Sequence, residues 1–144
     1  YSIPTKTVGI ERMKMSSKGR YGIYIAVCLA ENYNKGFVPV SEIAGKTGVT
    51  EKYLEQILAK LKSDGIVDAM RGSCGGYKLS LSPDNITVGR VLRSLEDNLS
   101  FVDCLGGKCN HSDACVAQHL WNKLYINLNK FLDSMTLQQL LEDN

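Results

Sequence analysis

The sequence predicts a mainly α-helical fold with one small β-hairpin, in the order of a winged helix-turn-helix followed by a long C-terminal helix. Three observations lead to this prediction. Apolar residues recur at three- and four-residue steps over most of the chain, which is the period of a helix. A glycine turn separates two of the expected helices, and a glycine-rich hairpin follows the second of them directly.

The helix-turn-helix is expected between residues 41 and 62, after a longer helix over about residues 17–34. Ser41 should cap its first helix and Thr50 its second, since a side-chain oxygen there accepts a bond from a free backbone N–H. Gly48 supplies the turn between them. Four apolar residues of the second helix fall at i, i+3, i+4 and i+7 and so form one core-facing side: Leu54, Ile57, Leu58 and Leu61.

The hairpin is expected to have strands over residues 66–70 and 77–81, with the tip Arg71–Gly76 between them. Glycines allow a backbone to approach another molecule closely, and Arg71 suits a narrow, electronegative minor groove of DNA. The tip therefore predicts a wing that touches nucleic acid. The alternative is an ordinary hairpin with a solvated arginine.

Charge is distributed unevenly along the chain. Residues 1–93 hold 14 Lys and Arg against 8 Asp and Glu, whereas residues 94–144 hold 3 against 7. A basic first part is typical of a protein that binds a polyanion. Lys18 and Arg20, at the start of the first helix, are placed to meet phosphates.

Three of the five cysteines, Cys104, Cys109 and Cys115, lie in one short segment. Gly106 and Gly107 let the backbone fold tightly, so three thiolates can converge on one metal centre. The alternatives are free thiols, or a disulfide in an exported protein. The odd number of cysteines and the absence of a visible signal peptide or a membrane-length apolar run favour a reducing, cytoplasmic location. Cys28 falls on an apolar helix face and is expected in the core, and Cys74 in the wing tip is interpreted as incidental.

A long helix is expected over residues 116–134, with a short one from about Thr136. The apolar face of the long helix is broad, which predicts packing against a second copy of the chain. The alternative is that this helix folds back on its own domain. The expected organisation is an arm at 1–14, a DNA-binding domain at 15–96, a cysteine segment at 97–115 and a dimerisation region at 116–144. The apolar positions of the long helix are Val116, Leu120, Trp121, Leu124, Tyr125, Leu128, Phe131 and Leu132.

Three motifs, Ser17–Gly22, Tyr53–Gln56 and Arg71–Tyr77, together resemble the IscR, NsrR and CymR family of bacterial winged-helix regulators. The resemblance covers about residues 15–142, and the three cysteines resemble the cluster-bearing branch, most closely that of IscR. It implies a homodimer on a palindrome-like site in double-stranded DNA, with the helix 50–62 in the major groove and the wing in the minor groove. The residues expected at DNA are Ser17, Lys18, Arg20, Thr50, Lys52, Tyr53, Glu55, Gln56, Arg71 and Gly75.

Two of these positions carry particular expectations. A carboxylate such as that of Glu55 can accept a hydrogen bond from the amino group of cytosine. Lys52 stands where IscR-type members commonly have a small hydroxyl residue, so the base preference of this chain is left open.

The resemblance also implies an iron–sulfur cluster, of the 2Fe–2S type, held by Cys104, Cys109 and Cys115 and sensitive to air. The chain departs from the IscR pattern in two ways. The first gap between cysteines is four residues instead of five, and the expected histidine position is occupied by Gln118, with His119 next to it. One helical residue turns a side chain by about 100°. The fourth ligand therefore stays open between His119, His111 and another oxygen donor.

Other functions are compatible with parts of the same sequence. Three thiolates and a histidine would also form a closed zinc site. A repressor that responds to cysteine metabolism or to nitric oxide would share the fold. The wing, the basic first part and the lack of a fourth cysteine in the segment argue against an electron carrier. No nucleophile–base group or phosphate loop is present, so an enzyme is not expected.

Overall fold

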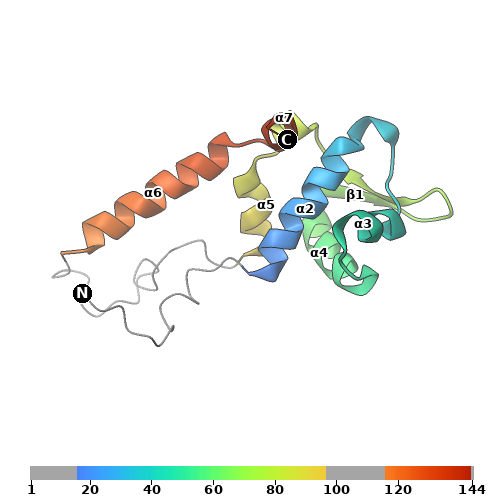
Figure 1. The fold of residues 1–144 in the computed structure, drawn as a ribbon, viewed down its shortest axis with the longest axis horizontal. Coiled ribbons are helices and arrows are strands. Elements are labelled where there is room, and N and C mark those ends of the chain that lie inside the picture. The colour runs from blue at the N-terminus through green and yellow to red at the C-terminus, as the bar shows by residue number, and fades with distance from the viewer. Residues whose placement is uncertain (1–15, 97–115, 144) are drawn as a thin grey trace.

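The computed structural model describes residues 16–96 and 116–143, and in these ranges the chain is mainly helical with one two-stranded antiparallel hairpin (Figure 1). This confirms the predicted fold class. Element labels follow Figure 1. The elements are α2 (Ser17–Glu31), η1 (Tyr33–Lys35), α3 (Val40–Thr47), α4 (Glu51–Ser63), β1 (Val67–Met70), β2 (Gly76–Leu79), η2 (Pro83–Asn85), α5 (Val88–Leu95), α6 (Gln118–Ser134) and α7 (Leu137–Glu142).

Helix α2 lies in the middle of the domain and packs against α3, α5 and α7. Its buried face contains Ile25 and Leu29, both fully buried, and Cys28, which is 5% exposed and so lies in the core as predicted. Tyr24, one turn before Cys28 and so near the same face by helical period, is instead 56% exposed. The apolar face defined by three- and four-residue steps is wider than the surface that the neighbouring helices cover. Tyr24 lies at the edge of this face, outside the covered part.

Side-chain caps fix several helix starts. The hydroxyl of Ser16 accepts from the backbone N–H of Gly19 at 3.3 Å at the start of α2, and Thr50 accepts from Tyr53 at 3.3 Å, as expected for α4. Ser41, by contrast, is not a cap. Helix α3 begins at Val40, two residues earlier than a Ser41 cap would place it, and the carbonyl of Pro39 accepts its first backbone bonds.

The first helix also ends earlier than the sequence indicates. Helix α2 stops at Glu31, and the side-chain amide of Asn32 donates to the carbonyl of Cys28 at 2.9 Å. That bond satisfies a carbonyl left free at the helix end. A single 3-10 turn, η1, then replaces the predicted last turn of α-helix.

The wing is the hairpin of β1 and β2, in which Val67 pairs with Leu79 and Met70 with Gly76. The start of its second strand is tied to the segment before α3, because Val38 and Tyr77 exchange two backbone hydrogen bonds of 2.8 and 2.9 Å. A Cβ atom at Gly75 would collide with the carbonyl of Met70, and one at Gly76 with the carbonyl of Val38. These two glycines are therefore required by packing within the chain itself.

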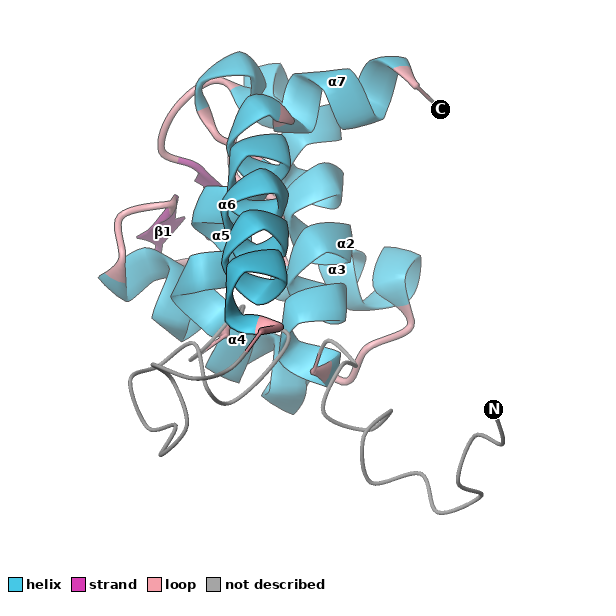
Figure 2. Ribbon diagram, turned by 90° about the vertical axis from the view of Figure 1, so that its left-hand side faces the viewer, coloured by secondary structure: helices cyan, strands magenta, loops and turns pink. Residues whose placement is uncertain are grey.

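Helix α6 is attached to the domain by its C-terminal end and otherwise projects away from it (Figure 1). In Figure 2, viewed from the side toward which it projects, α6 lies in front of α5. Leu132 is buried against Val88 and Leu92 of α5. Nearer the start of the helix, Leu120 and Ile126 are about half exposed. Because the domain does not cover this part, the alternative in which the helix folds back over its own domain is wrong for this chain. The exposed apolar residues toward its free end are Val116, Leu120, Leu124, Tyr125 and Ile126.

Candidate nucleic-acid interface

The outer face of α4 carries the polar residues that the sequence singles out. Lys52, Glu55 and Gln56 are exposed, while the four predicted apolar residues of this helix are buried to 1% exposure or less. The apolar face of the helix therefore packs against the core, and its polar face is exposed to solvent. That arrangement suits a helix that enters a groove of DNA.

The start of α2 lies beside the start of α4. The rings of Tyr21 and Tyr53 meet edge to face, with centroids 5.9 Å apart and an angle of 90° between their planes. Tyr53 is consequently half-buried and joins the two helices. Lys18 and Arg20, which are both exposed, sit on the turn of α2 next to this contact, so the domain has cations beside the polar face of α4.

The wing places Arg71 and Cys74 in solvent, and both residues are exposed. Gly72 has a φ of 112°, a left-handed conformation that glycine adopts without strain. The exposed tip can therefore turn sharply and carry Arg71 outward.

The last residues of α5 are bonded to three different elements. Arg93 makes a paired contact with Asp133 of α6, at 2.6 and 3.0 Å, and Ser94 donates to the carboxylate of Asp64 at the end of α4. The carboxylate of Glu96 accepts from the backbone N–H of Ser16 at 3.0 Å and from its hydroxyl at 2.5 Å. These contacts were not anticipated from the sequence, since no local pattern links residues 30 to 80 positions apart.

The three cysteines proposed as metal ligands, together with His111, lie outside the described residues. In the ranges 16–96 and 116–143, no group of three or more His, Cys, Asp or Glu side chains is arranged to hold a metal ion. His119 is exposed on the first turn of α6, one residue after Gln118. It therefore lies four residues after the last cysteine of the segment and is open to solvent.

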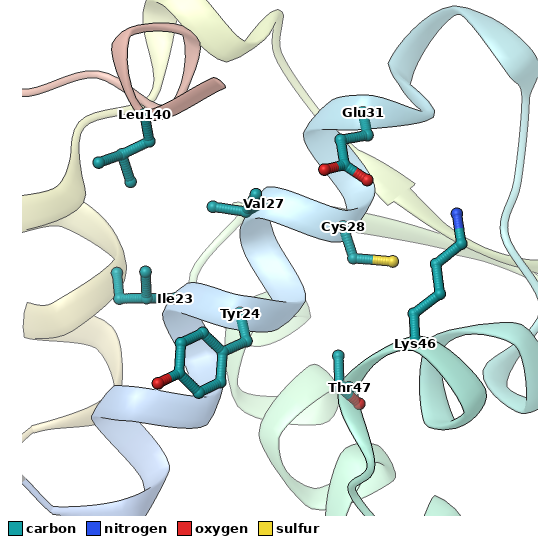
Figure 3. A pocket seen from close by; sticks show the side chains of 8 residues that line it. All are labelled: Ile23, Tyr24, Val27, Cys28, Glu31, Lys46, Thr47 and Leu140. Carbon is teal, nitrogen blue, oxygen red and sulfur yellow. The ribbon is translucent and has the colours of Figure 1, made fainter. Parts of the chain in front are cut away.

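A hollow of about 440 Å³ lies between α2, α3 and α7, and Cys28 lines it (Figure 3). The sulfur of Cys28 is directed toward the part of α3 that carries Lys46 and Thr47. Burial raises the pKa of this thiol, and the nearby positive charge of Lys46 opposes that shift only in part. Burial therefore disfavours the thiolate form of Cys28, the form in which a cysteine reacts as a nucleophile.

A helix-turn-helix followed by a wing, with exposed polar residues on its second helix, defines a DNA-binding transcriptional regulator of the winged-helix type. The family model Rrf2, described as an iron-dependent transcriptional regulator, matches residues 15–143. The chain therefore belongs to the Rrf2 family. The named relatives are regulators and not enzymes, in agreement with the sequence.

Two kinds of comparison agree with this assignment. The HTH-type transcriptional regulator IscR of Aliivibrio salmonicida is 36% identical over 133 residues, which is 92% of this chain and 79% of that protein. The solved structure of T. potens IscR matches with a TM-score of 0.75 and 36% identity, covering 90% of this chain and 87% of that one. The structure of CymR, the global cysteine regulator of B. subtilis, matches with a TM-score of 0.73 and 34% identity, covering 91% and 98%.

Of the helices in the described part of the chain, none combines the length and the apolar character needed to cross a bilayer.

Proposed function

We propose that this protein is a homodimeric transcription regulator whose binding to a palindrome-like DNA operator depends on an iron–sulfur cluster held by Cys104, Cys109 and Cys115. The observation that carries the proposal is the position of these cysteines. In the sequence they fall between Glu96, which is bonded to the start of α2, and α6, which projects from the domain. A family described as iron-dependent regulators supports the choice of iron.

In the proposed complex, α4 enters the major groove and the wing reaches the minor groove. Glu55 and Gln56 face base edges, and Lys52 lies beside them, at a position where IscR-type members commonly have a small hydroxyl residue. Arg71 enters the minor groove, where a narrow groove concentrates negative potential. The remaining contacts go to the sugar–phosphate backbone, from Ser17, Lys18, Arg20, Thr50, Tyr53 and Gly75.

The dimer is proposed to form through α6. Leu120 is 52% exposed and Ile126 is 50% exposed on a helix that its own domain does not cover. A second copy of the chain supplies an identical apolar face, so a two-fold arrangement would bury both. Two domains held in this way would present two α4 helices to the two halves of a palindrome.

The donor set fits an iron–sulfur cluster, because thiolates are its usual protein ligands. The three cysteines would hold it, and the fourth ligand is left to His119, His111 or an oxygen donor. When bound, such a cluster supplies redox- and oxygen-sensitive chemistry to the segment between α5 and α6. The cytoplasm of a bacterium holds the DNA and keeps thiols reduced, so we place the protein there.

The proposal links the cysteine segment to DNA through α5. In the sequence, residues 97–115 follow Glu96 directly, and Glu96 is bonded to Ser16 at the start of α2, close to Lys18 and Arg20. Ser94, two residues earlier, is bonded to the end of α4. A bias of about 1.4 kcal/mol between two arrangements of these contacts would change DNA affinity about tenfold.

The test is anaerobic purification of the full chain, followed by an absorption spectrum and assays of iron, sulfide and zinc. A brown protein with iron and sulfide in equal amounts is expected. DNA binding is then compared for the loaded and metal-free forms at one salt concentration, because phosphate contacts make affinity strongly salt-dependent. A colourless protein with one zinc ion for each chain would replace the cluster by a structural metal.

A further inference from the structure

A hollow whose charged lining residues are all positive lies between the end of α4 and the tip of the wing. Its volume is about 590 Å³, and its walls include Lys62, Arg71, Gly72, Gly75 and Tyr77. Lys62 and Arg71 are the only lining side chains that are charged at neutral pH. A surface of this kind attracts an anion.

Lys62 has no acidic partner in the part of the chain that the structure describes, whereas the neighbouring Lys60 does. The ammonium group of Lys60 lies 3.5 Å from the carboxylate of Asp64. Both lysines are exposed on the last turn of α4. The charge of Lys60 is thus already balanced within the protein, and the charge of Lys62 is free to meet a ligand.

The period of the helix puts Lys62 on the same face as Glu55. The two residues are seven positions apart, which is close to two full turns and a rise of about 10 Å. Lys60 is five positions from Glu55 and points to about 140° away from it. When Glu55 faces the bases, Lys62 therefore faces the same DNA, two turns nearer the wing.

We propose that Lys62 binds a backbone phosphate of DNA, at the border between the major groove that α4 enters and the minor groove that the wing enters. A lysine ammonium group is a mobile point charge suited to a single phosphate. The hollow would receive the sugar–phosphate strand that separates the two grooves. The proposal rests on the proposed docking of α4 and the wing.

The test compares Lys62→Gln with Lys60→Gln, two substitutions that remove the same charge two residues apart. The probes are a duplex recovered by binding-site selection with the wild-type protein and a mixed-sequence duplex of equal length. Affinity is measured over a range of KCl concentrations, with circular dichroism to verify folding. Lys62→Gln should weaken binding to both duplexes by similar factors, because a phosphate contact carries no sequence information.

The salt dependence of DNA affinity decides whether Lys62 contacts a phosphate. Loss of one phosphate contact reduces the slope of log affinity against log salt by about 0.9, so the deficit of Lys62→Gln should shrink about 3.5-fold between about 50 and about 200 mM KCl. Lys60→Gln should keep the wild-type slope. Single phosphates of the duplex are then replaced by neutral methylphosphonates. At one position the replacement should weaken binding of the wild type but leave the affinity of Lys62→Gln unchanged.

Three results separate the possible failures. A wild-type slope in Lys62→Gln, or an equal change of slope in Lys60→Gln, would overturn the role of Lys62 and leave the regulator intact. DNA binding that is indifferent to the metal would overturn the cluster dependence and leave the phosphate contact standing. A wild-type protein that binds neither duplex would overturn both.

Discussion

The hydroxyl group of Ser94, on the last turn of α5, donates a hydrogen bond to the carboxylate of Asp64, the residue at the C-terminal end of α4. Helix α5 is thereby fixed to the helix that carries the proposed base contacts. Through Arg93 the same helix is fixed to Asp133 of α6. Helix α5 thus links α6 to α4 through these two side-chain contacts as well as through apolar packing, which includes Leu132 against Val88 and Leu92.

The first prediction uses the pKa of Asp64 as a reporter of this contact. The hydrogen bond from Ser94 is the main reason that the pKa of Asp64 lies below its usual range, with a smaller contribution from Lys60. Ser94→Ala should raise this pKa toward its ordinary value, as measured by NMR titration of the carboxyl carbon. Ser134→Ala is the matched control. The hydroxyl of Ser134 donates to the carbonyl of Phe131 within α6, away from Asp64, so its loss should leave the pKa of Asp64 unchanged.

The sign of the pH dependence follows from the direction of that shift. Because the pKa of Asp64 is lowered in the folded protein, its charged form is favoured by folding. The resulting stability is present above the ordinary carboxyl pKa of about 4 and is lost as the pH falls through the lower folded value. Ser94→Ala should make the free energy of unfolding less sensitive to pH in this acid range. An unchanged titration of Asp64 would mean that the contact is absent in solution.

Local patterns in the sequence predicted most of the elements. Leu54, Leu58 and Leu61 share one face at the period of a helix, and Thr50 is a capping residue, so α4 could be found from spacing alone. The start of α3 was missed because Pro39 satisfies its first backbone bonds through a carbonyl and not through a side chain. A cap of that kind has no side-chain signal.

Contacts between distant residues could not be predicted. Ser94 and Asp64 are 30 positions apart, and Glu96 and Ser16 are 80 apart, so both contacts depend on how the helices pack. The exposure of Tyr24 also depends on how the helices pack. The helical period shows on which face a residue lies, but not how much of that face a neighbouring helix covers. The roles proposed for the DNA-contact residues and the cysteines remain predictions.

The second prediction concerns base selection by Glu55. A carboxylate close to bases rejects wrong partners by leaving them unpaired, and it also attracts the right one. Glu55→Ala should therefore relax the preference profile in a binding-site selection and change affinity for mixed-sequence DNA little. Glu31→Ala, an exposed carboxylate near the far end of α2, should preserve the profile. A wild-type profile in Glu55→Ala would show that this side chain does not read bases.

The third prediction tests the dimer. Leu124 is 39% exposed on α6, so a charge there is tolerated in a single chain but not inside an apolar interface. Leu124→Glu should weaken self-association at least about 100-fold, which corresponds to about 2.7 kcal/mol. Asn122→Glu puts the same charge on the other side of the helix and should leave the dimer intact. Sedimentation equilibrium measures both, and a stable dimer of Leu124→Glu would exclude this face as the interface.

The fourth prediction concerns the metal ligands. Replacement of Cys104, Cys109 or Cys115 by alanine should in each case abolish stable iron loading, because a cluster that loses a thiolate ligand is poorly held. Cys74→Ala is the control: this cysteine is free and exposed in the wing, and its loss should leave the iron and sulfide content unchanged. Circular dichroism should show the wild-type helix content in all four variants. Full iron and sulfide in any one of the first three would remove that residue from the ligand set.

The fifth prediction joins the metal to DNA through Glu96. Loaded and metal-free protein should differ in DNA affinity or site preference at matched salt, and Glu96→Ala should bring the ratio of the two affinities toward one while keeping the wild-type iron content. The reason is that Glu96 lies just before the cysteine segment and holds Ser16, beside the cations of α2. Asp84→Ala, an exposed carboxylate on η2, should keep the wild-type ratio. If Glu96→Ala also keeps that ratio, the coupling runs through α6 instead. If the wild type itself binds a panel of sites equally in both forms, the metal stabilises the fold and regulates nothing.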